Sequence, residues 1–243
     1  MKKRLFAILA ICVAFVLLMT GCQAALISSN VLVNADGSGT KTITAVIYGD
    51  DSILAGEENA AEPGTVGNNS KYLLVSGDDL IAKIKSYSAL DSLEVTAVPD
   101  GLNTIVTVSY SFDSIEDYTA KTKTLAKDNA DSIEAPTFTQ NADGSYTYKE
   151  NTENTQLSLD NIFLSLYNDP EAFSKDGQGD CDLESFGYDY TCIYTIMDVS
   201  ATVGTDTNSV QMNVYNDSNT IVEQDWADYI EVTGTPVVEE PEP

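Results

Sequence analysis

The sequence contains no histidine, and its single arginine is Arg4. The lack of histidine excludes Ser-His-Asp and Cys-His catalytic arrangements and nearly all zinc and copper sites, because imidazole is the usual base or ligand there. The lack of further arginines disfavours bidentate binding of phosphate or carboxylate groups. Phosphate-binding loops, dinucleotide fingerprints and G-x-S-x-G elbows are also missing. We therefore expect no catalysis of these common types.

Positive charge is scarce as well. The chain has 12 lysine and arginine residues against 38 aspartate and glutamate residues, which gives a net charge of −26. The negative electrostatic field of such a chain repels nucleic acids and anionic lipid headgroups. It favours solubility and attracts divalent cations. The composition thus excludes nucleic acid as a partner, while its 43% apolar residues are enough to build a folded core.

The N-terminus has the profile of a signal peptide. Lys2, Lys3 and Arg4 precede an uncharged apolar run at 5–19, which is shorter than the roughly 20 residues that a membrane-spanning helix needs. The alternatives are an ordinary signal peptide that ends near a cysteine, or an uncleaved anchor helix. Removal of residues 1–21 would take away three cations and change the net charge from −26 to 9 − 38 = −29.

The residues Leu18-Met19-Thr20-Gly21-Cys22 resemble the lipobox of bacterial lipoproteins. This resemblance implies that Cys22 receives a diacylglyceryl group and becomes the N-terminus of the mature chain. Two acyl chains hold a protein firmly at a bilayer. The membrane is therefore an expected partner through Cys22, with the chain on the extracytoplasmic side, at a Gram-positive cell surface.

Two cysteines remain in the mature chain once Cys12 leaves with the signal and Cys22 carries the lipid. Outside the cytoplasm, Cys181 and Cys192 can form a disulfide. The alternative is a pair of unpaired thiols.

Alternating β-branched runs and turn sequences predict an α+β fold, with antiparallel hairpins and a few flanking helices in the order ββαββα. The residues at 49–70 are poor in large apolar side chains and predict a surface excursion. The predicted strands are 26–33, 41–48, 93–98 and 104–112, with helices from Ser76 to about Leu90 and at 114–127.

The second half of the chain begins with another predicted hairpin, and its turn repeats the sequence Asn-Ala-Asp-Gly-Ser of residues 34–38 at 141–145. Either the ββαββα unit is duplicated, or a good turn sequence is used twice. The predicted strands are 136–140, 145–149, 190–203 and 209–215, with helices at 160–167, from Asp169-Pro170 onward and at 222–230.

The predicted organisation is a signal peptide at 1–21, an N-terminal α+β domain at 22–130, a β-rich region at 131–235 and a Pro/Glu-rich disordered tail at 236–243. The turn at 36–39 and the segment at 112–118 make residues 26–130 resemble the LppM-type domain of bacterial surface lipoproteins. This resemblance implies a small α+β domain and assigns no functional residues.

Two motifs invite a chemical interpretation. Asp176, Asp180, Asp182 and Glu184 alternate with glycines and could supply the oxygen ligands of a calcium ion, although their spacing is not that of an EF-hand. The alternative is a solvated acidic loop. Ser38-Gly39-Thr40-Lys41 matches S-x-x-K, but it lies in a predicted hairpin turn without the companion motifs, so we interpret it as chance.

The tyrosines offer a further means of binding, for example Tyr188, Tyr190 and Tyr194. They either stack on sugars or fill a protein interface when exposed, or pack against a sheet when half-buried. We predict a cell-surface lipoprotein that acts as a binding or interaction module, with a protein or a glycan as partner and without a cofactor unless calcium binds. The alternatives are an extracytoplasmic hydrolase that uses two carboxylates and a solute-binding lipoprotein of a transporter.

Overall fold

The computed structural model describes residues 27–48, 73–100, 103–172, 196–213 and 228–235. These residues form an α+β fold of two sheets and three α-helices, and the strands are mostly antiparallel, as predicted. The strands are β1 Ile27–Val33, β2 Gly39–Tyr48, β3 Glu94–Asp100, β4 Asn103–Phe112, β5 Thr137–Gln140, β6 Tyr146–Asn151, β7 Ile196–Val203, β8 Asp206–Asn213 and β9 Tyr229–Gly234. The helices are α3 Gly77–Tyr87, α4 Ile115–Ala126 and α5 Glu153–Asn168, with a 3-10 helix, η2, at Lys127–Ser132.

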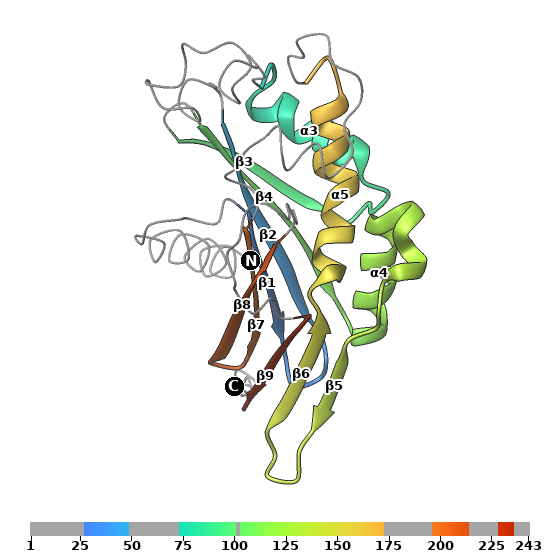
Figure 1. Ribbon diagram of the computed structural model, residues 1–243, viewed down its shortest axis with the longest axis vertical. Helices are drawn as coiled ribbons and strands as arrows, with labels where there is room; N and C mark the ends of the chain where they lie inside the picture. The colour runs from blue at the N-terminus through green and yellow to red at the C-terminus, as the bar shows by residue number, and fades with distance from the viewer. Residues whose placement is uncertain (1–26, 49–72, 101–102, 173–195, 214–227, 236–243) are drawn as a thin grey trace, which may run out of the picture.

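The larger sheet has six strands in the order β3-β4-β2-β1-β7-β8, and the smaller one has three in the order β5-β6-β9. Figure 1 shows α3, α4 and α5 gathered along one side of the larger sheet, with the β5–β6 hairpin extending past its end. Strand β1 pairs antiparallel with β2 and parallel with β7. The C-terminal strands β7 and β8 therefore belong to the same sheet as the strands of the N-terminal half.

Alternation along the strands creates the core. On β2, Ile43, Ala45 and Ile47 are buried while Thr44 and Val46 between them are half-buried. The buried face packs against apolar side chains of the helices, such as Leu80 and Ile84 of α3. The central strands of the larger sheet thus turn an apolar face toward the helices and a more polar face, which also carries Leu32, Val46 and Ile105, away from them.

The two Asn-Ala-Asp-Gly-Ser turns have the same structure. Asp36 accepts hydrogen bonds from the backbone N–H and the hydroxyl of Ser38 at 3.0 and 2.6 Å, and Asp143 does the same for Ser145 at the same distances. Gly37 and Gly144 have φ values of +80° and +86°, which glycine adopts without strain. Both predicted hairpins are confirmed.

The turns repeat, but the strand pairing does not. The first hairpin lies inside the six-stranded sheet, whereas β5 and β6 pair with β9 in the smaller sheet. Within the described ranges, the second half therefore does not copy the sheet of the first.

Three predictions for the second half are wrong in detail. Helix α5 begins at Glu153, two turns before the predicted start at 160, because its first turns are polar and were not recognised as helical. Residues 169–172 form a turn where a helix was expected. Tyr229–Gly234 forms strand β9 rather than the end of a helix at 222–230, because the alternating Ile230 and Val232 are buried and the strand pairs with β6.

The helix starts are confirmed with one difference. Ser114 caps α4 and accepts a hydrogen bond from the Asp117 N–H at 3.2 Å. Ser76 occupies the N-cap position of α3 as predicted, but its side chain makes no capping hydrogen bond.

Candidate functional site

Lys41 occupies a core position of β2. It has the same strand phase as Ile43, Ala45 and Ile47, its register partners are Val31 and Tyr110, and it is 1% exposed. Burial of an ammonium group costs several kcal/mol unless charges and hydrogen bonds compensate it. Lys41 and the side chains around it are therefore a candidate functional site.

Strand β6 and the first turn of α5 supply the partners of Lys41. Its Nζ donates to Thr155 Oγ1 at 2.9 Å and lies 3.6 Å from Oε2 of Glu150, which is also 1% exposed. Nζ is also 6.0 Å from the ring centroid of Tyr118 on α4. The amine is thus enclosed by side chains from β6, α4 and α5.

Both carboxylate oxygens of Glu150 have hydrogen-bond donors. The hydroxyl of Tyr118 donates to Oε1 at 2.5 Å, and the hydroxyl of Tyr148 donates to Oε2 at 3.0 Å. Asn154 Nδ2 lies 3.5 Å from Oε1. We call Lys41, Glu150, Tyr118, Tyr148, Asn154 and Thr155 the buried polar core.

Burial governs the ionisation of these groups. It lowers the pKa of the Lys41 ammonium, and the negative charge of Glu150 opposes this shift. Burial and then the charge of Glu150 raise the pKa values of the Tyr118 and Tyr148 hydroxyls well above 10.0. Both tyrosines therefore remain protonated donors at neutral pH.

A second set of hydrogen bonds holds the buried polar core in place. The Asn154 amide donates to the Glu134 carbonyl at 2.8 Å and accepts from the Glu134 N–H at 3.0 Å, which fixes the segment before β5. Thr155 Oγ1 lies 3.5 Å from Ser29 Oγ on β1. Since all six side chains of the buried polar core are buried, a substrate from solvent does not reach them in this conformation.

The opposite face of the six-stranded sheet has a different character. Strand registers place three largely polar rows of side chains across it: Thr96, Thr107, Thr44 and Ser28; Ser109, Thr42, Asn30, Ser200 and Ser209; and Ser111, Thr40, Thr202 and Thr207. In the third row Leu32 lies between Thr40 and Thr202. We call the polar residues of these rows the hydroxyl face. Most are half-buried or exposed, and the described helices lie on the other side of the sheet.

Hydrogen bonds between neighbouring strands order the hydroxyl face. Thr44 and Thr107 are 3.3 Å apart through their Oγ1 atoms, and Thr202 and Thr207 are 3.0 Å apart. Asn30 Nδ2 donates to Ser200 Oγ at 2.8 Å. The face is therefore a regular array of groups that can both donate and accept.

The predicted site residues lie elsewhere. The lipidation residue Cys22, the predicted disulfide Cys181 and Cys192, and the candidate calcium ligands Asp176, Asp180, Asp182 and Glu184 all fall outside the described residues, as do Tyr188, Tyr190 and Tyr194. These assignments stay predictions. Within the described ranges, no three histidine, cysteine or acidic side chains come together in a way that could hold a metal ion.

The S-x-x-K match does not form a helical motif. Ser38 is part of the first turn and bonds to Asp36, whereas Lys41 lies in β2 and points into the core. Its actual partner is Glu150, which the sequence analysis did not single out. The phase of β2 could have revealed Lys41, because this lysine shares the inward parity of Ile43 and Ile47.

None of the helices in the described ranges has the length and apolar character needed to cross a bilayer. No protein-family model matches the chain, and no curated protein or solved structure is significantly similar to it.

Proposed function

We propose that the protein is a lipid-anchored cell-surface module that binds a neutral glycan through the hydroxyl face. The leader and the lipobox-like sequence that ends at Cys22 support the surface location. The single observation that carries the binding role is the regular array of hydroxyl and amide groups across the six strands.

The chemistry of the hydroxyl face favours a glycan over a protein. Serine and threonine hydroxyls donate and accept hydrogen bonds, as sugar hydroxyls do. The rows contain no tryptophan, tyrosine or arginine, which are the residues that dominate protein–protein interfaces. Glu94 and Asp198 extend two of the rows, so an uncharged polymer suits the face better than an anionic one.

The alternative of a carboxylate hydrolase has less support. Such an enzyme needs two acids that reach a substrate. Glu150 is the buried carboxylate among the described residues, and it is enclosed by Tyr118, Tyr148, Asn154 and Lys41. The second alternative, a transporter-associated receptor, needs two comparable lobes with a cleft, whereas the described strands form one large sheet and a smaller sheet beside it.

A glycan array tests the proposal. The full chain with Cys22→Ser, which cannot accept the lipid, is applied to neutral and acidic glycans. We expect the chain to bind neutral glycans, and this binding should persist at high salt concentration. Thr42→Arg, in the centre of the hydroxyl face, should lower the affinity about tenfold or more, which is equivalent to about 1.4 kcal/mol.

Thr139→Arg is the matched control, because Thr139 is exposed on β5, outside the hydroxyl face. It should bind as the parent chain does. Absence of binding to every neutral glycan, or equal binding by the Thr42→Arg chain, would refute the assignment of this face.

A further inference from the structure

The buried polar core presents an energetic problem. An ion pair enclosed in a protein interior often contributes no more stability than apolar side chains of the same volume. Lys41 nevertheless lies among Val31, Ile43 and Tyr110 in the middle of a sheet, opposite a carboxylate that is equally buried. A reaction that removes both charges would remove their desolvation cost.

We propose that Lys41 and Glu150 condense into an intramolecular amide, which joins β2 of the larger sheet to β6 of the smaller sheet. The reacting groups are already close: Nζ is 3.6 Å from Oε2 of the carboxylate whose carbon it would attack. The contact places the amine next to the carboxyl group that it would attack, so little movement is needed to bring the two groups together.

The step balances without any added reagent. A proton passes from the ammonium to the carboxylate within the pair, which leaves a neutral amine and a carboxylic acid. The Nζ–Cδ bond then forms, one Cδ–O bond breaks, and the departing oxygen leaves as water with one proton from the acid and one from the amine. No group is oxidised or reduced.

The surrounding side chains suit each part of this step. Burial lowers the pKa of Lys41, which favours the nucleophilic amine. Tyr118 and Tyr148 donate hydrogen bonds to the two oxygens of Glu150, so they can stabilise the oxyanion of the tetrahedral intermediate. Thr155 accepts a hydrogen bond from Nζ at 2.9 Å and orients the amine.

The charged and titratable groups around Lys41 come from β6, α4 and β4. They are Glu150 and Tyr148 on β6, Tyr118 on α4, and Tyr110 as the register partner on β4. Within this described set Glu150 is the carboxyl group, and therefore it is the electrophile that the geometry favours.

Mass spectrometry tests the proposal on the full chain. The wild-type chain and a Lys41→Met chain are produced in the same bacterium, denatured, and measured intact, so that both carry the same N-terminal modification. The two sequences fix the mass difference expected without any cross-link. We expect the measured mass of the wild-type chain to fall below the value calculated from this difference by one water molecule. A digest of the wild-type chain should also yield a branched peptide that joins Lys41 to Glu150.

The controls separate the partners. Glu150→Ala should abolish the branched peptide and restore the mass calculated from its sequence. A wild-type chain with the full calculated mass and no branched peptide would overturn the proposal, and its measurement does not depend on the folding of any variant. A loss of one ammonia molecule with a link from Lys41 to Asn154 would overturn the assignment of Glu150.

Discussion

At the scale of single residues, Lys41 and Glu150 show how strand phase places polar groups in a core. Both occupy inward positions of strands whose other inward residues are apolar or aromatic, such as Ile43 on β2 and Tyr148 on β6. Their burial is acceptable only because three further side chains donate to Glu150 and Thr155 accepts from Lys41. Removal of any one donor should therefore be costly.

Tyr118→Phe provides a test at this scale. The change removes the hydroxyl that donates to Glu150 Oε1 and leaves a buried acceptor without that partner, at an expected cost of about 1 to 3 kcal/mol in the free energy of unfolding. Urea denaturation followed by circular dichroism measures it.

Tyr146→Phe is the control for this experiment. Tyr146 stacks on Phe138 at 5.0 Å between ring centroids and lies outside the buried polar core. This variant should lose no more than about 0.5 kcal/mol in the free energy of unfolding, as is usual for changes away from buried networks. Equal losses for the two variants would contradict the role given to Tyr118.

At the scale of elements, local turn chemistry made much of the fold predictable. The Asp-Gly turns specify the hairpins β1–β2 and β5–β6, and apolar periodicity identifies α3 and α4. The first turns of α5 were not predicted as helix because Asn154, Thr155 and Ser158 are polar yet buried. Their inward face meets the buried polar core rather than an apolar layer, so an apolar stripe is missing.

Pairing between distant strands could not be predicted in the same way. The parallel pairing of β1 with β7 and the antiparallel pairing of β6 with β9 join segments far apart in the sequence without a turn that specifies them. The contact between Lys41 and Glu150 follows from this long-range arrangement. Sequence phase could have shown that each is buried, but not that they meet.

The connection between α3 and the end of α5 is a clamp of charged groups. Lys83 Nζ lies 2.8 Å from both Asp169 Oδ2 and Glu171 Oε2, and the Tyr87 hydroxyl donates to Asp169 at 2.5 Å. Burial tends to raise the pKa of Asp169, but the hydrogen bonds from Lys83 and Tyr87 outweigh it and lower the pKa to about 2 from 3.8. The clamp therefore stabilises the fold above about pH 4 and loses this contribution as the pH falls through about 2.

Asp169→Asn should lower the free energy of unfolding by about 1 kcal/mol at neutral pH, a value that allows for solvent screening of a partly exposed pair. Near pH 2 the difference between the variant and the wild type should be smaller, because about half of the wild-type carboxyl is then protonated. Urea melts at the two pH values measure the difference.

Glu171→Gln is the matched control for the clamp. The Glu171 side chain contacts the same lysine but is 81% exposed, so this change should have little effect at either pH. A difference between Asp169→Asn and wild type that persists unchanged near pH 2 would contradict the assignment of the clamp to the ionised Asp169.

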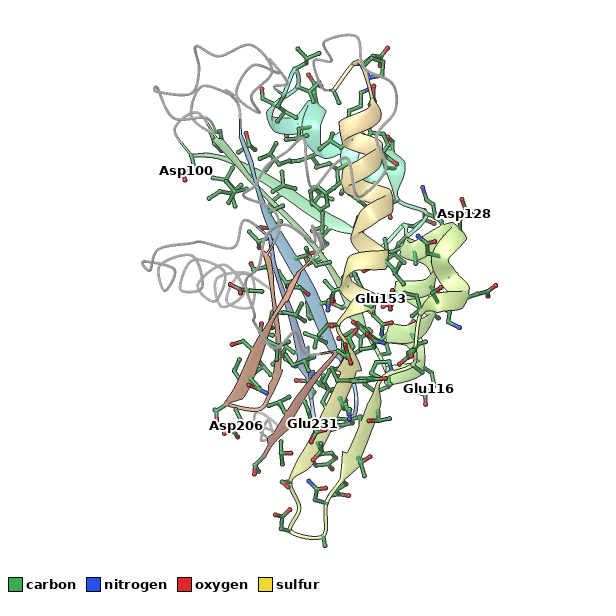
Figure 2. The ribbon with its side chains drawn as sticks, in the orientation of Figure 1. Asp100, Glu116, Asp128, Glu153, Asp206 and Glu231 are labelled. Carbon is green, nitrogen blue, oxygen red and sulfur yellow. The ribbon has the colours of Figure 1, made fainter. Side chains whose placement is uncertain are left out.

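At the scale of the whole molecule, acidic charge is spread widely. Asp100, Glu116, Asp128 and Asp206 lie at well-separated places on the outline of the protein (Figure 2). A net charge of −26 distributed in this way keeps copies apart and repels anionic polymers. This charge also opposes direct contact of the folded part with anionic lipids.

The proposed lipid anchor at Cys22 is open to direct measurement. The full chain and its Cys22→Ser variant are expressed in a Gram-positive bacterium that is fed a labelled fatty acid, and the purified chains are examined for label and for their N-terminal residue. The account predicts a labelled wild-type chain that begins at Cys22 and an unlabelled variant. A wild-type chain that lacks the label, or that retains residues 1–21, would contradict it.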